Sequence, residues 1–210
     1  MRAIIFDFDG VILDSVNIKT RAFARLFEEH GPDVVREAVE HHLAHGGVSR
    51  FRKFQHIHEH ILRRPLSDAE SKQLGEKFST LVFDEVVKAA WIPGAPEFLH
   101  EQHTRYRCFV ASGTPQEELV RIVELRQLTP YFAGVFGTPP TKEEISRSIL
   151  AEHGLGAAEV VFIGDAMTDY AAAKECGLAF IGIAADGRGP FPAGTRVLRD
   201  LRGLAAALAE

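Results

Sequence analysis

The chain has 210 residues, of which 46% are hydrophobic and 25% are charged, and its formal net charge at pH 7 is −5. This composition is that of an ordinary globular protein with one sizeable domain or a domain with a large insertion. The acidic balance gives no basic surface for nucleic acid. No apolar run approaches the ~20 residues of a membrane-spanning helix.

Two cysteines, Cys108 and Cys176, lie in or beside apolar stretches. We expect both to be free thiols, which is typical of a reducing compartment. The N-terminal residues lack the pattern of a signal peptide. These features together predict a cytoplasmic protein.

The first predicted element is a strand over residues 3–8, within the stretch MRAIIFDFDGVILDS. Asp7 and Asp9 stand at its carboxyl end, directly after buried apolar residues. Ionised carboxylates in such a place are costly unless a cation or several hydrogen bonds compensate them. The pattern therefore predicts a positively charged partner opposite the two aspartates.

A helical segment follows over residues 16–92, with many His, Arg and Lys and no convincing strand. We interpret it as a helical domain inserted after the first strand. Pro93 and Gly94 are expected to form the hinge that returns the chain to the sheet. The predicted division is a core of residues 1–15 and 93–210 and an insert of residues 16–92.

Two features of the insert raise the question of ligand binding. Ser49 is expected to be the N-cap of a helix that begins at Arg50. His56 and His60 are four residues apart and share a helix face, as zinc ligands can. Because no cysteine or third ligand pattern lies nearby, we expect a solvated polar face there.

After the insert, short apolar runs alternate with helical segments. The expected strands cover residues 107–112, 134–137, 160–165 and 179–184, and the expected helices cover residues 115–128, 142–154 and 168–177. Nearly continuous apolar strands that alternate with helices are typical of a parallel sheet with right-handed crossovers. The sequence thus predicts an α/β, doubly wound, Rossmann-like core.

Polar residues follow three of these strands, where ligands bind in open parallel sheets. The groups are Asp7 and Asp9, then Ser112, Gly113 and Thr114, and then Asp165 and Asp169, with Lys142 near the same edge. Converging carboxylates repel one another, and a hard divalent cation such as Mg²⁺ relieves that repulsion. Carboxylates, a metal, a lysine and a Ser-Gly cradle at a helix start are the parts that phosphoryl transfer needs.

The segments DFDGVILDS, ASGTP, Lys142 and GDAMTD, in this order, resemble the four signature motifs of the haloacid dehalogenase-like hydrolases. The arrangement is most similar to the phosphoglycolate-phosphatase and β-phosphoglucomutase branch. The resemblance spans nearly the whole chain. It implies an α/β core with an α-helical cap inserted after the first motif.

The resemblance implies that Asp7 is the nucleophile that attacks phosphorus and that Asp9 is the acid and then the base. Ser112 and the Gly113 amide would hold the phosphoryl oxygens. Lys142 would pair with Asp7 and the phosphoryl group as charge develops. The second motif reads Ser-Gly-Thr where Ser-Asn or Thr-Asn is common.

For the metal, the resemblance implies Mg²⁺ bound by the carboxylates of Asp7 and Asp165 and by the backbone carbonyl of Asp9. Asp169 would bind the ion or orient its waters. Ala166 stands where many relatives carry serine. Neither this departure nor that of the second motif removes a required functional group.

In the β-phosphoglucomutase branch, a Gly-x-Ser-Arg segment of the cap reads the substrate, and HGGVSRFRKF resembles it. By this resemblance Ser49 and Arg50 would face the substrate, with Lys53 adding positive potential. A capped, solvated helix fits the same residues equally well.

The sequence therefore predicts a Mg²⁺-dependent phosphatase of a small phosphorylated metabolite, acting through an aspartyl-phosphate, with neither nucleic acid nor membrane as partner. The alternatives are a sugar phosphomutase and a catalytically silent binding module on the same fold. Asp9, Asp165 and Asp169 argue against a dehalogenase, which needs neither a second acid nor a magnesium site. The substrate and the oligomeric state are left open.

Overall fold

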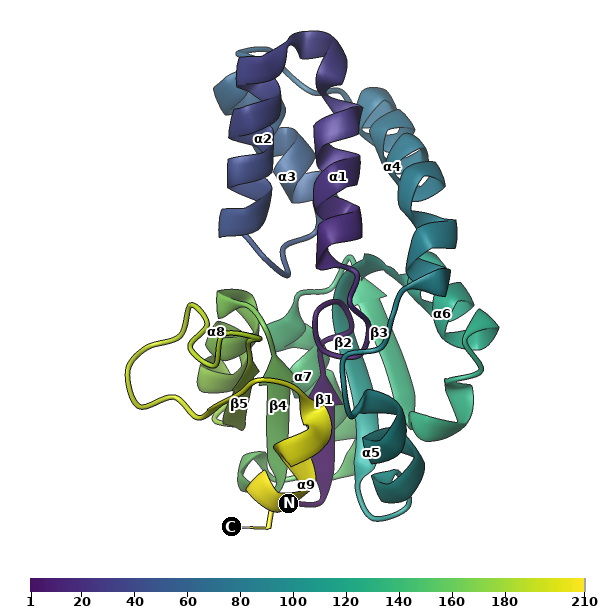
Figure 1. The fold of residues 1–210 in the computed structure, drawn as a ribbon, viewed down its shortest axis with the longest axis vertical. Helices are drawn as coiled ribbons and strands as arrows, with labels where there is room; N and C mark the ends of the chain where they lie inside the picture. The colour runs from purple at the N-terminus through teal and green to yellow at the C-terminus, as the bar shows by residue number, and fades with distance from the viewer. Residues whose placement is uncertain (210) are drawn as a thin grey trace.

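Six parallel strands form a single sheet in the lower half of the molecule (Figure 1). The protein is represented by a computed structural model that describes residues 1–209. The strands are β1 (Ala3–Phe6), β2 (Arg107–Pro115), β3 (Gly134–Thr138), β4 (Val160–Gly164), β5 (Ala179–Ile183) and β6 (Val197–Leu198). Their order is β3-β2-β1-β4-β5-β6, with every neighbouring pair parallel. This is the order of a doubly wound sheet, so the predicted fold class is confirmed.

The helices fall into two groups. The upper group in Figure 1 is α1 (Val16–Leu26), α2 (Pro32–Ala44), α3 (Arg50–His56) and α4 (Asp68–Lys88). The group around the sheet is α5 (Ala95–Gln102), α6 (Gln116–Leu125), α7 (Lys142–His153), α8 (Met167–Glu175) and α9 (Leu204–Ala207). The upper group sits above the carboxyl ends of the strands. A parallel sheet binds ligands at that edge, so these helices cover the expected site.

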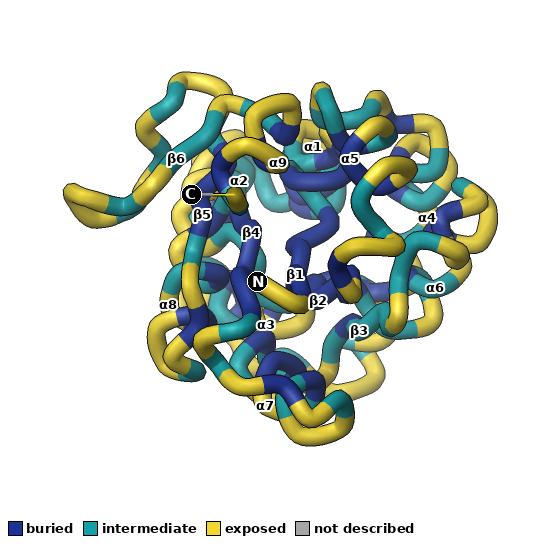
Figure 2. The backbone as a smooth tube through the Cα atoms, turned by 90° about the horizontal axis from the view of Figure 1, so that it is seen from below, coloured by how far each residue is buried: buried dark blue, intermediate teal, exposed yellow. Residues whose placement is uncertain are grey.

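Side chains alternate between the two faces of the sheet, and both faces are buried. Ile4 and Phe6 of β1 pack in the cluster that includes α5, α6 and α9, whereas Ala3 and Ile5 pack with α7 and α8. Figure 2 shows β1 and β4 dark blue at the centre of the molecule, with exposed backbone around them. Burial on both faces explains why the strand sequences are apolar throughout.

The upper helices have an aromatic core of their own. The Phe23 ring of α1 lies 4.9 Å from Phe78 of α4 and 5.7 Å from Phe54 of α3, between ring centroids. All three side chains are almost fully buried. Aromatic rings at these spacings and tilts contribute beyond the area that they bury. The helices of residues 16–88 therefore pack around a centre of their own.

The observed elements differ from the predicted ones mainly at their ends. β1 stops at Phe6 instead of residue 8, because the Phe8 carbonyl accepts from the amides of Ile12 and Leu13 in a tight turn. β2 continues to Pro115, beyond the predicted end at residue 112. The sequence interpretation did not assign α5, α9 or β6, all of which are short.

The remaining expectations concern cysteines and membranes. Cys108 is buried in the sheet, Cys176 is half-buried, and both are free thiols. Within residues 1–209, none of the helices is both long enough and apolar enough to cross a bilayer.

We expect Phe54→Ala to lower the free energy of unfolding by about 3–5 kcal/mol, because it leaves a cavity in the aromatic core of the upper helices. Urea denaturation of the purified protein measures this change. Leu125→Ala is the matched control, since Leu125 is 54% exposed and its truncation should change stability by no more than about 0.5 kcal/mol. Equal losses for the two variants would contradict this description of the core.

Candidate active site

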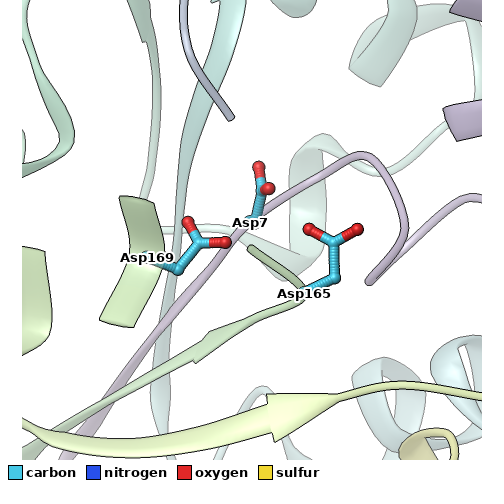
Figure 3. Close-up of side chains that lie close together, drawn as sticks. All are labelled: Asp7, Asp165 and Asp169. Carbon is cyan, nitrogen blue, oxygen red and sulfur yellow. The ribbon is translucent and has the colours of Figure 1, made fainter. Parts of the chain in front are cut away.

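Three carboxylates meet at the carboxyl edge of the sheet, between β1 and β4 (Figure 3). Asp7 follows β1, Asp165 follows β4, and Asp169 lies in the first turn of α8. Their oxygens lie within 4.8 Å of one another. The strand order reverses between β1 and β4, and a doubly wound sheet opens its ligand crevice at that place. The sheet topology thus brings Asp7 together with Asp165 and Asp169, which lie far from it in the sequence.

Lys142 lies between two of these carboxylates. Its Nζ is 2.9 Å from Asp7 Oδ2 and 2.5 Å from Asp169 Oδ1, and all three side chains are buried. Lys142 is the first residue of α7, and a capping box formed by Thr141 and Glu144 fixes the start of that helix. Burial would lower the pKa of Lys142, but the charges and hydrogen bonds of Asp169 and Asp7 raise it above its ordinary value. Lys142 is therefore a permanent cation in the site.

One lysine does not neutralise three carboxylates. Burial, together with the charges of Asp169 and Asp9, raises the pKa of Asp7 to about 7 despite the nearby Lys142. Burial and the charges of Asp7 and Asp169 likewise raise the pKa of Asp165. When ionised, the three carboxylates place excess negative charge on hard oxygen ligands, which is the donor set that a divalent cation such as Mg²⁺ prefers. The residues present fit such an ion.

Two glycines make room for the carboxylates. A Cβ added to Gly10 would lie 2.2 Å from Asp165 Oδ2, and one added to Gly164 would lie 2.2 Å from Asp169 Cβ. Gly10 also has a φ of +79°, which other residues rarely adopt. The loop after β1 and the end of β4 can therefore approach the acidic groups only because both positions lack a side chain.

Asp9 stands beside the triad in a separate polar network. Its carboxylate accepts from Ser15 Oγ at 2.6 Å and from Thr114 Oγ1 at 3.1 Å, and it forms an ion pair with Lys19. Burial would raise the pKa of Asp9, but the charge of Lys19 and these hydrogen bonds outweigh it and lower the pKa. In this arrangement Asp9 is an ionised carboxylate whose charge is balanced by α1.

The second predicted motif lies next to Asp9. Ser112 Oγ is 3.5 Å from Asp9 Oδ2 and accepts from the Thr114 amide at 3.1 Å. Neither Ser112 nor Thr114 caps α6, whose N-cap is Pro115. Gly113 comes close to the upper helices, because a Cβ there would lie 2.5 Å from the carbonyl oxygen of Gly47. The Ser-Gly pair is thus at the edge of the sheet, where the sequence pattern placed it.

A cavity of about 600 Å³ lies between the aspartates and the upper helices, which line its upper side. Its roof presents Lys19, Lys53 and His42 beside the apolar rings of Phe23 and Phe78. Lys53 Nζ lies 3.0 Å from His42 Nδ1. Burial, and to a lesser extent the charge of Lys19, lowers the pKa of Lys53 to about 7. An anion bound in the cavity would favour the ammonium form of Lys53.

Arg50 of α3 lines the same cavity but is held by an ion pair across to α6. Its two guanidinium nitrogens lie 2.6 and 2.9 Å from the two oxygens of Glu118. The guanidinium also lies over the ring of Phe78, 4.5 Å from the centroid. Arg50 therefore ties α3 to the sheet domain, and its fork of donors is already occupied.

The loop between α2 and α3 rests on the carboxyl edge of the sheet. Thr168 Oγ1 donates to the Gly46 carbonyl at 2.9 Å, and a Cβ added to Gly47 would lie 2.1 Å from the same hydroxyl. Ser49 ends this loop as the N-cap of α3, without a side-chain capping bond. The glycine pair thus lets this loop pass close to the start of α8 on one side of the cavity.

Sequence reasoning missed Lys19, His42 and the contact of Thr114 with Asp9. Ser15 and Lys19 are four residues apart at the start of α1, so they share a helix face, and that spacing is the signal that could have identified Lys19. No local sequence pattern could have identified His42, because its contact with Lys53 depends on how α2 packs against α3.

The sequence of this chain matches the family model described as haloacid dehalogenase-like hydrolase over residues 4–183. That match covers most of the chain and includes all the aspartates of the site. This chain belongs to the haloacid dehalogenase-like hydrolases.

Relatives within the haloacid dehalogenase-like hydrolases are phosphatases. The phosphoglycolate phosphatase of Aliivibrio fischeri is 28% identical over 193 residues, covering 84% of this chain and 81% of the relative. The phosphorylated carbohydrates phosphatase of Thermotoga maritima is 27% identical over 184 residues, covering 85% and 82%. A hydrolase from Pseudomonas syringae shares the fold with a TM-score of 0.78 at 20% identity, over 100% of this chain and 98% of that one.

The raised pKa values predict that Mg²⁺ stabilises the protein more at high pH. The pKa of Asp7 rises from 3.8 to about 7 on folding, so its contribution to stability is present below about pH 4 and is lost as the pH rises through 7. A divalent cation compensates the carboxylates only once they are ionised. We expect Mg²⁺ to raise the melting temperature more at about pH 8 than at about pH 5.

Differential scanning fluorimetry measures this difference. NaCl at equal ionic strength is the control, since general screening should give little shift at either pH. An equal Mg²⁺-induced shift at the two pH values would contradict the assignment of the ionised aspartates as the cation site.

Proposed function

We propose that the protein is a Mg²⁺-dependent phosphatase that hydrolyses a small phosphate monoester carrying a second anionic group. The observation that carries this proposal is the cluster of Asp7, Lys142, Asp165 and Asp169 at the floor of a cavity of about 600 Å³. A nucleophilic carboxylate, a fixed ammonium and a divalent cation site are what the transfer of a phosphoryl group to an enzyme requires.

Asp7 is the proposed nucleophile. Its Oδ1 accepts from the Phe8 amide at 2.6 Å and its Oδ2 faces Lys142, so the carboxylate is held in one orientation. Attack on phosphorus forms a P–O bond to Asp7 and breaks the bond to the substrate oxygen. Lys142 stabilises the negative charge that develops on the phosphoryl oxygens, with Ser112 and the Gly113 amide as further donors.

Asp9 is the proposed proton carrier. It gives a proton to the departing alcohol and then takes one from the water that attacks the aspartyl-phosphate, which restores Asp7 and releases phosphate. In the structure Lys19 holds Asp9 ionised. Asp9 must therefore take up a proton, with its ion pair to Lys19 broken, before it can act as the acid. Lys19 is a positioning residue in this scheme.

Mg²⁺ would be held by Asp7, Asp165 and Asp169, with the backbone carbonyl of Asp9 as a further proposed ligand. When bound, it supplies positive charge to the transferring phosphoryl group and cancels the repulsion among the carboxylates. Asp169 also accepts from the Ala166 amide at 3.0 Å and contacts Lys142, so it is oriented before any ion binds.

We also propose that residues 16–92 act as a cap that selects the substrate. The roof of the cavity offers Lys53 and Lys19 beside the apolar rings of Phe23 and Phe78. The guanidinium of Arg50 is paired with Glu118, and Ser49 lies at the N-cap of α3. Of the three predicted cap residues, Lys53 is therefore the one most available to bind an anionic group of the substrate. A carboxylate beside the phosphate fits this roof, and phosphoglycolate has that chemistry.

The test is phosphate release from a panel of phosphorylated compounds in the presence of Mg²⁺ and then EDTA. The panel holds phosphoglycolate, hexose phosphates, glycerol phosphates, nucleotides and p-nitrophenyl phosphate. We expect Mg²⁺-dependent release that is fastest for phosphoglycolate. Asp7→Asn should lower the rate by more than about 10⁴-fold, as loss of a nucleophile does.

Each other outcome of the panel has a definite meaning. An Asp7→Asn protein with ordinary turnover would refute the mechanism. Interconversion of hexose 1-phosphate and 6-phosphate without phosphate release would instead show a mutase. Binding of phosphate esters without any turnover would show a silent module.

A second prediction separates the two roles of Asp9. p-Nitrophenolate needs no proton to leave, so Asp9→Asn should still form the phosphoenzyme from p-nitrophenyl phosphate but hydrolyse it slowly. We expect a burst of one p-nitrophenolate per chain, followed by turnover that is about 10²–10⁴-fold slower. Stopped-flow absorbance measures both phases.

Asp14→Asn is the matched control for Asp9→Asn. Asp14 is an exposed aspartate of the same motif and lies outside the polar network of Asp9. Asp14→Asn should hydrolyse p-nitrophenyl phosphate at the rate of the unaltered protein, and its burst should equal that of the unaltered protein. A steady-state rate for Asp9→Asn equal to that of Asp14→Asn would contradict the role of Asp9 as base.

A further inference from the structure

Four histidines from two segments of the upper helices lie together in a row. His41 and His45 come from the end of α2, and His56 and His60 come from α3 and the π-helical turn after it (Ile57–Ile61). The ring centroids of His41 and His56 are 3.8 Å apart and nearly parallel, at 3°. His45 lies 4.0 Å from His41, and His60 lies 4.4 Å from His56. The phosphatase chemistry proposed above uses none of these contacts.

The hydrogen bonds of the outer pair leave a nitrogen of each ring available. His45 Nδ1 lies 2.8 Å from the His41 carbonyl, and His60 Nδ1 lies 3.3 Å from the His56 carbonyl. A carbonyl oxygen only accepts, so both Nδ1 atoms carry the proton and both Nε2 atoms have a free lone pair. A backbone carbonyl on one ring nitrogen is the usual way in which a metal-binding histidine is oriented.

The helix spacing suits a shared ligand. Each pair is separated by four residues, so each pair projects from one face of its helix, and the two faces meet between His41 and His56. His45 and His60 are exposed, and the inner pair is half-buried. Burial, followed by the neighbouring His45 and His56, lowers the pKa of His41 to about 4. Neutral imidazoles are the form that binds a metal.

The rings are stacked side by side, so their nitrogens do not yet converge. Of the residues that the structure describes, only Asp7, Asp165 and Asp169 bring three ligand atoms within 4.8 Å. The rings of His45 and His60 are exposed to solvent, so a rotamer change of either would meet little steric resistance. Imidazole favours zinc, nickel and copper, whereas the aspartate triad favours hard cations.

We propose that His41, His45, His56 and His60 form a binding site for a divalent transition-metal ion, with Zn²⁺ as the ion that best fits imidazole ligands. The ion would link the end of α2 to α3. The loop between these helices contains Gly46 and Gly47, which contact Thr168 at the edge of the sheet. A bound ion would therefore restrain the loop of Gly46 and Gly47, which lines the cavity. The site does not depend on the proposed function.

Isothermal titration calorimetry with Zn²⁺ tests this proposal, with excess Mg²⁺ present to occupy the aspartate triad. We expect one Zn²⁺ per chain to bind to the unaltered protein. His56→Gln/His60→Gln should weaken that binding by at least about tenfold, since it removes half of the ligands. His100→Gln/His103→Gln at the end of α5 is the matched control and should bind Zn²⁺ as the unaltered protein does.

Circular dichroism and the melting temperature without Zn²⁺ show whether the variant folds. His60→Gln alone, at an exposed position, is the second variant should the double variant be unstable, and it should also weaken binding. Zn²⁺ binding that is unchanged in both variants would place the ion at the aspartates and overturn the proposal. Absence of Zn²⁺ binding to the unaltered protein would overturn it as well.

Discussion

The ion contacts of Lys142 are the constraint around which the site is built. One buried ammonium lies against Asp7 and Asp169, while Asp165 faces the same space without a cation of its own. Breaking such a buried cluster on one side leaves an uncompensated charge, which is strongly destabilising. The strand ends, the helix starts and the nearby glycines must therefore all be correctly placed, because each of them positions a member of this cluster.

The parallel sheet supplies that register with little help from the loops. Asp7 and Asp165 follow neighbouring strands that pair residue by residue from Ala3 with Val160 to Phe6 with Ile163. A shift by one residue would turn either aspartate to the other side of the sheet. Gly10 and Gly164 then let the backbone close around the acidic groups. The geometry of the three aspartates is in this sense a product of strand pairing, and the upper helices contribute the surroundings.

Different parts of the molecule were predictable from the sequence to different degrees. The apolar strands, their order along the chain and the motif residues at their ends predicted the α/β core and the meeting of Asp7 with Asp165, because parallel strands end at one edge. The ion pair of Arg50 with Glu118 joins residues 68 positions apart on two helices, and no local pattern reports it. The contact of His41 with His56 depends in the same way on how α2 packs against α3.

The ion pair of Arg50 with Glu118 has a consequence for the placement of the upper helices. Both groups are nearly dry in this structure, with side-chain exposures of 5% and 9%. Since each group loses its hydration to form the pair, the pair adds little to the free energy with which α3 packs against α6. A bidentate pair forms in one relative orientation of guanidinium and carboxylate. The pair therefore contributes to the orientation of α3 on the sheet domain more than to the strength with which α3 is held there.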